Sequence, residues 1–141
     1  MSDQQLRTYL TYTTLVVIHE YLDFCLGKAR DRKVDVEAAL LKYGTAAYPL
    51  IERLRDEVTE IYRPTYGDKA QEITVAVRKI EQDRASSLAN RSWGVSDCLN
   101  LIKSARTLAA EMTPDEPGPS VRTWVEKLIP IRRAYVAPCP G

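Results

Sequence analysis

The sequence of 141 residues lacks the residue constellations on which ordinary catalysis depends. It has a single histidine, His19, with Asp23 one helical turn further along. General acid–base catalysis and metal binding normally require additional partners around such a residue. A lone histidine between Leu15 and Leu22 is more typical of packing, so we expect no catalytic residue and no metal site here.

The three cysteines, Cys25, Cys98 and Cys139, are far apart and form neither a CxxC pair nor a Cys/His cluster. This spacing excludes the usual zinc sites. The odd number argues against a disulfide framework, and Cys25 and Cys98 are predicted to be small core residues on apolar helical faces. Cys139 is third from the end of the sequence, which does not fit a prenylation box.

Phosphate-binding loops and a surplus of basic charge are also missing. The glycines are isolated, with no GxGxxG or Walker pattern, so no nucleotide cradle and no cofactor are predicted. Lys and Arg together number 20 against 19 Asp and Glu, for a net charge of +1. Nucleic-acid binding therefore remains an alternative only through local basic patches, Arg30/Arg32/Lys33 or Arg132/Arg133.

Long apolar runs are absent as well. The run from Leu15 to Ile18 is followed at once by His19 and Glu20, which fits neither a signal peptide nor a membrane span. We therefore expect a cytoplasmic protein with no membrane partner.

Apolar residues recur at helical spacing along most of the chain. The predicted helical stretches are 2–26, 36–43, 48–62, 68–88, 96–112 and 120–129, and a proline-rich connection at 113–119 precedes the last. The Thr/Tyr/Val-rich segment 8–18 favours strand by composition, but its length favours helix. The pattern predicts an all-α fold, a single-domain antiparallel bundle of about five to six helices over 1–136, with an irregular tail at 137–141.

Carboxylates offer a second alternative. Glu57 and Glu60 have the ExxE spacing with which helical nucleotide pyrophosphohydrolases hold Mg²⁺, but the ExxD that should follow is missing around Glu81. A magnesium-dependent helical hydrolase using these three residues stays an alternative. Carboxylates interleaved with Arg and Lys are more typical of a solvated helical face.

The remaining signals point to protein contacts. Glu57 and Arg84 interrupt apolar stripes, where a buried charge would need a partner. Arg and aromatic residues, which are enriched at interface hot spots, share the segments 62–66 and 90–94. We predict a non-catalytic protein–protein interaction module, such as an adaptor, inhibitor or small regulatory subunit, whose candidate contact residues are Tyr62, Arg63, Tyr66, Arg84, Arg91 and Trp93. The first helix, apolar on two sides, or the last helix would suit a homodimer.

Overall fold

The computed structural model describes residues 1–135, and they contain helices and no strand. The predicted all-α class is confirmed. The predicted tail at 137–141, including Cys139, lies outside the described residues. The helices are α1 (Asp3–Lys28), α2 (Lys33–Tyr66), α3 (Ala70–Ser92), α4 (Val95–Glu111) and α5 (Pro119–Tyr135), with short 3₁₀ turns at Arg30–Arg32 and Gly67–Lys69.

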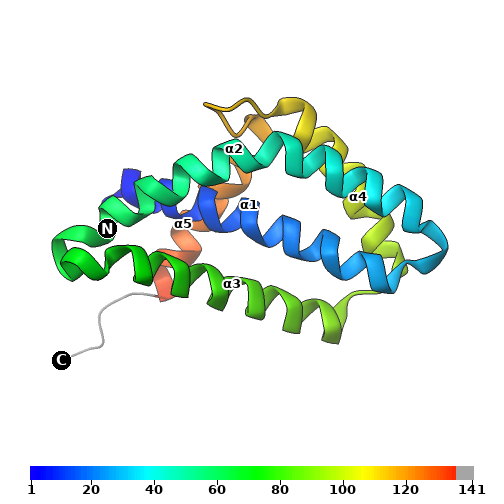
Figure 1. Cartoon of the computed structure of the whole chain (residues 1–141), viewed down its shortest axis with the longest axis horizontal. Helices are drawn as coiled ribbons and strands as arrows, with labels where there is room; N and C mark the ends of the chain where they lie inside the picture. The colour runs from blue at the N-terminus through cyan, green and yellow to red at the C-terminus, as the bar shows by residue number, and fades with distance from the viewer. Residues whose placement is uncertain (136–141) are drawn as a thin grey trace.

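The three long helices α1, α2 and α3 lie along the long axis of the molecule, and α4 and α5 cross it steeply (Figure 1). Successive members of the first three run in opposite directions, whereas α4 and α5 depart from a regular bundle. α1 packs against each of the other helices. No helix of the described residues has the length and apolar character needed to cross a membrane.

The central position of α1 explains its two apolar rows. Ser2 begins the helix with a capping box, because its hydroxyl accepts a hydrogen bond from the Gln5 backbone at 3.1 Å and the Gln5 side chain accepts one from the Ser2 backbone at 2.9 Å. Tyr12 and Leu15, inside the strand-prone segment, are fully buried. Burial on several sides outweighs the weak preference of Thr, Tyr and Val for strands.

α2 joins the two predicted helices at 36–43 and 48–62 into one, so the six separate stretches expected from the sequence are too many. Gly44 and Pro49 both lie inside α2, although glycine costs about 1 kcal/mol and proline about 3 kcal/mol in a helix interior. The buried row Val36, Tyr43 and Leu50 runs across this region without a break. Its continuous packing offsets both local breakers.

α3 differs more from its prediction. Asp68 lies in a 3₁₀ turn and does not cap the helix, which begins at Ala70 without a side-chain cap. In the sequence, Ile73, Val77, Ile80 and Leu88 form an apolar stripe at helical spacing, but Ile80 and Leu88 are exposed. The buried residues are instead small and are spaced along the helix: Ala70, Thr74, Ala85 and Ala89. α3 therefore approaches its neighbours through short side chains.

The connection from α4 to α5 is tightly constrained. Gly118 has φ +90, and a Cβ atom there would lie 2.6 Å from Cβ of Glu111. The Glu111 carboxylate accepts hydrogen bonds from the backbone N–H and hydroxyl of Ser120, at 3.1 and 2.9 Å. α5 then continues through Pro130 to Tyr135, so the predicted end of the helix before Pro130 was wrong.

The expectation that the cysteines are unpaired was also wrong. Cys25 and Cys98 are fully buried, as predicted, but they form a disulfide that joins the end of α1 to the start of α4. Their Cα atoms are 5.6 Å apart across a separation of 73 residues. The sequence separation hid this pair, because two crossing helices bring the cysteines together only in the folded chain.

Candidate functional site

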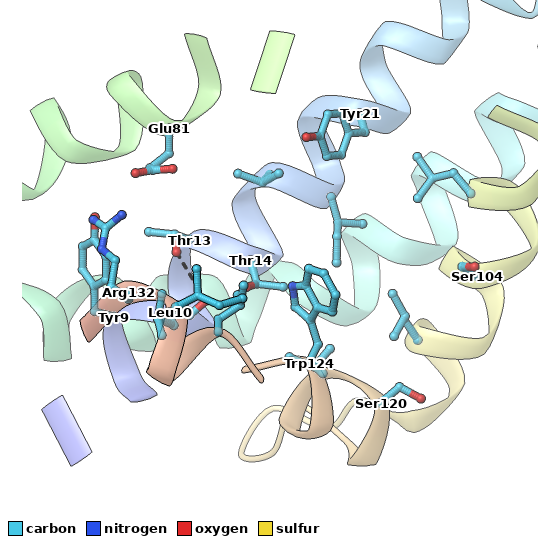
Figure 2. Close-up of a pocket in the computed structure, with 17 residues that line it drawn as sticks. Tyr9, Leu10, Thr13, Thr14, Tyr21, Glu81, Ser104, Ser120, Trp124 and Arg132 are labelled. Atoms are coloured by element: carbon cyan, nitrogen blue, oxygen red, sulfur yellow. Dashed lines mark hydrogen bonds between the residues drawn. The ribbon is translucent and has the colours of Figure 1, made fainter. Parts of the chain in front are cut away.

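A groove with a volume of about 750 Å³ runs along one face of α1. α1 forms its floor, α4 with α5 forms one wall, and α3 contributes Glu81 on the opposite side (Figure 2). Among residues 1–135, α3 does not pack against α4 or α5. We call this feature the α1 groove, and its floor residues are Tyr9, Leu10, Thr13, Thr14, Val17, Ile18 and Tyr21.

The wall opposite α3 is mostly apolar. It includes Leu101 and Leu108 of α4 and Trp124, Leu128 and Ile131 of α5. Trp124 is 53% exposed, and Figure 2 shows its indole projecting from α5 toward the middle of the groove. A large aromatic side chain held in this position is typical of the residues that dominate binding energy at interfaces.

One end of the groove is polar. The Arg132 guanidinium lies over the Tyr9 ring, 5.5 Å from its centroid, and donates a hydrogen bond to the Tyr9 hydroxyl at 3.3 Å. Glu81 enters from α3 with its side chain only 16% exposed, and Arg84 lies 3.7 Å from it. Burial, helped by Glu81, raises the pKa of Tyr9, and Arg132 opposes this rise. The Tyr9 hydroxyl therefore stays protonated and able to hydrogen-bond near neutral pH.

Two of the predicted contact residues lie beside this polar end. Burial raises the pKa of Tyr62 to about 12, with smaller influences from Tyr9, Glu81 and Arg132. Arg84 contacts Glu81, as described above, but its side chain is exposed. Arg84 therefore reaches solvent and pairs with Glu81, although it interrupts an apolar stripe in the sequence. Glu57 is exposed too and lies 3.8 Å from Arg53.

The other predicted contact residues do not form one surface. Arg63 pairs with Glu60 at 3.0 Å, and Tyr66 packs edge-on against Tyr62, so these residues gather at the end of α2. The remaining two lie more than 20 residues along α3, about 30 Å away at 1.5 Å per residue. They are Arg91, which donates a hydrogen bond to the Ser87 carbonyl at 3.3 Å, and Trp93.

Trp93 has a role that the sequence did not suggest. Its ring stacks on Tyr21, with centroids 4.4 Å apart and an interplanar angle of 17°. Because Tyr21 lines the α1 groove, Trp93 supports the end of the groove opposite Arg132. Trp124 was missed as a contact residue because its helical spacing with Val121 and Val125 suggests burial beside them, and those two residues are indeed buried.

The alternative sites receive little support from the geometry. Residues 1–135 contain no group of three or more His, Cys, Asp or Glu side chains placed to hold a metal ion, so Glu57, Glu60 and Glu81 do not converge. His19 and Asp23 are exposed and 3.7 Å apart.

The proposed basic patches are partly occupied by acidic neighbours. Arg32 lies 3.3 Å from Asp35, and Arg133 lies 2.6 Å from Asp3. Arg132 lies against Tyr9 at the polar end of the groove. Nucleic-acid binding through these residues would have to displace contacts within the chain.

No family model, no curated protein and no solved structure matches this chain.

Proposed function

We propose that the protein is a non-catalytic interaction module whose α1 groove binds an amphipathic helix of another protein. It would act as an adaptor, an inhibitor or a small regulatory subunit. The observation that carries this proposal is the groove over the partly buried apolar face of α1, with the apolar wall of α4 and α5 on one side and Glu81 of α3 on the other. Helix-in-groove recognition uses such a surface, with anchors at i, i+3, i+4 and i+7 entering an apolar channel.

The dimensions of the groove suit this ligand. Its floor extends from Tyr9 to Tyr21, about 18 Å at 1.5 Å per residue, which corresponds to roughly three turns of helix. An incoming helix would place its apolar side chains against Trp124 and Leu108. The polar end with Tyr9 and Arg132 would receive one hydrogen-bonding or acidic side chain, which fixes the register of the helix.

The test compares two charge-introducing variants of the whole chain. Trp124→Lys places a cation in the groove wall, and Val75→Lys makes the same kind of change at an exposed residue of α3 that does not line the groove. Quantitative mass spectrometry of proteins captured from native lysate by the wild type and both variants should reveal a partner that only Trp124→Lys loses. The same captured set for both variants would contradict the proposal.

The partner is then purified and titrated against the Trp93→Phe variant, in which Trp124 is the remaining tryptophan. Helix binding should move its emission to shorter wavelength, because the half-exposed indole becomes buried. A partner that binds without changing this emission uses another surface. If no captured protein shifts the Trp124 emission but a small amphipathic molecule does, the groove binds a different kind of ligand.

The predicted cytoplasmic location needs a separate test. The cytoplasm keeps most thiols reduced, whereas the Cys25–Cys98 disulfide is typical of oxidising compartments. Alkylation in denaturant of freshly opened cells, before and after reduction, measures the state of these two cysteines, because unfolding exposes thiols that are buried in the fold. Alkylation of both before reduction supports the cytoplasm, and alkylation only afterwards supports an oxidising location.

A further inference from the structure

The outer face of α2 carries apolar side chains that no part of the described chain covers. Val34, Leu41 and Tyr48 are 79%, 73% and 59% exposed and recur at intervals of seven residues. Ala38 and Thr45, also exposed, lie between them. The alternating steps of four and three residues are the a/d spacing of a coiled-coil seam. We call this row, from Val34 to Tyr48, the α2 seam.

We propose that the α2 seam binds the same seam of a second copy of this chain, with the two helices antiparallel. A hollow of about 390 Å³ lies beside the seam and is lined by Ala38, Leu41, Lys42, Thr45, Ala46 and Ala109. In an antiparallel pair, Tyr48 of each copy can lie level with Ala38 of the other copy. The large tyrosine ring then packs against the small alanine and the hollow beside it. In the same register Leu41 faces Thr45. One surface thus supplies both knob and hole, as a two-fold interface requires.

Charge favours the antiparallel orientation. The segment 28–33, which spans the turn before α2 and ends at its first residue, contains four basic residues and one acidic residue. The segment 52–60 of α2 contains four acidic residues and two basic ones. The register set by Tyr48 and Ala38 brings each basic segment alongside the acidic segment of the other copy. A parallel pair would place the two basic segments together. Within one chain most of these charges contact near neighbours, such as Lys33 with Glu37 at 3.8 Å, and such exposed contacts exchange at little cost. Arg53 is an exception, because it pairs with Asp115 of the α4–α5 connection at 3.3 Å.

The interface is small, because a single helix pair buries well below the roughly 1,600 Å² of a standard stable complex. We therefore expect a reversible dimer with a Kd on the order of 10 μM. The dimer is independent of the α1 groove, because the seam lies on the face of α2 opposite its buried residues Val36, Tyr43 and Leu50. In this proposal the dimer contact is made by α2, whereas the sequence suggested the first or the last helix.

Sedimentation equilibrium of the full chain between about 1 and 300 μM tests the proposal. The wild type should change from monomer to dimer over this range, and Leu41→Asp should remain monomeric. Val75→Asp, the matched change on α3, should dimerise like the wild type. A wild type that is monomeric at 300 μM would overturn the proposal, and so would a Leu41→Asp variant that dimerises normally. Circular dichroism checks that both variants are folded, which we expect because both sites are exposed.

Charge reversal tests the orientation. In the antiparallel pair, Lys33 of one copy lies within one helical turn of Asp56 of the other, and the two-fold symmetry repeats this contact. Lys33→Glu alone or Asp56→Lys alone should therefore weaken dimerisation roughly fivefold. The double variant should restore the wild-type Kd. If the two losses add in the double variant, the antiparallel register is wrong.

Discussion

The Cys25–Cys98 disulfide gives a prediction whose size follows from the fold. Reduction leaves both side chains in place, so no cavity is created, and the principal change is the release of a loop in the unfolded chain. For a separation of 73 residues, the chain-entropy relation gives about 15 cal/mol/K, or about 4.4 kcal/mol at 25 °C. We expect the oxidised protein to be more stable to unfolding by this amount.

The assay uses the Cys139→Ser variant, so that only the two buried cysteines remain. Urea unfolding followed by circular dichroism should show the midpoint fall by roughly 2 M on reduction, for an m-value of about 2 kcal/mol/M. The melting temperature should fall by roughly 10 to 15 °C. A matched sample of the Cys25→Ala/Cys98→Ala variant, with and without reductant, reports any effect of the reductant itself.

Two results would refute the reasoning. Thiol counting of the denatured, unreduced Cys139→Ser variant should find no reactive thiol, and a count of two would show that the bond does not form. If the bond forms but reduction moves the midpoint by less than about 0.5 M, then closing the loop does not restrict the unfolded chain as the relation assumes.

Three further perturbations test the packing and the electrostatics. Gly118→Ala should lower the free energy of unfolding by roughly 3 kcal/mol, because φ is +90 and the new Cβ would overlap Glu111. A loss below about 0.5 kcal/mol in urea unfolding would contradict this geometry. The Thr59 and Thr74 hydroxyls are buried and 2.8 Å apart, so valine at either position should lower the free energy of unfolding by about 1 kcal/mol. The double replacement should lower it by less than the sum of the two single effects, whereas strict additivity would mean that the contact contributes nothing. Burial raises the pKa of Tyr62 from 10 to about 12, so the stability that it contributes is complete below pH 10 and is lost as the pH rises to 12. Tyr62→Phe should flatten the alkaline limb of stability against pH, and an unchanged slope would show that another group causes it.

The helices could be read from the sequence wherever burial and helical spacing coincide. α4 is the clearest case, since Cys98, Ile102, Ala105 and Ala109 are all buried as their spacing predicts. The errors occurred where packing across the fold outweighs local signals. α2 continues through Gly44 because its buried row is continuous.

α3 was misread for the opposite reason. Its small residues approach α1 and α2, while the larger Ile80 and Leu88 remain exposed. Hydrophobicity alone ranks Ile80 and Leu88 above alanine, so the predicted apolar stripe lies about one residue, or roughly 100° around the helix, away from the buried row. Burial of alanine depends on how closely neighbouring helices approach, and that distance is set by the whole fold.

The candidate site was harder to predict than the helices. The α1 groove lies over the part of the α1 surface that α3, α4 and α5 do not fully cover. No local sequence pattern predicts which part of a helix its neighbours will cover. Arg132 was noted only as a possible phosphate contact, yet it meets Tyr9 across 123 residues. The disulfide was missed for the same reason, because helix crossings decide which distant residues meet.

The disulfide also divides the molecule into a cross-linked part and a part outside the cross-link, and we expect these two parts to differ in local unfolding. The loop closed by Cys25 and Cys98 contains α2 and α3, whereas α5 lies wholly outside it. α5 is attached to α1 largely through its row of apolar residues and through exposed ion pairs, such as Arg7 with Glu126 at 2.6 Å. Amide hydrogens of α5 should therefore exchange with solvent through a local detachment that leaves the cross-linked part intact. Local detachment of α5 would also widen the α1 groove, because α5 carries Trp124, Leu128 and Ile131 of its apolar wall.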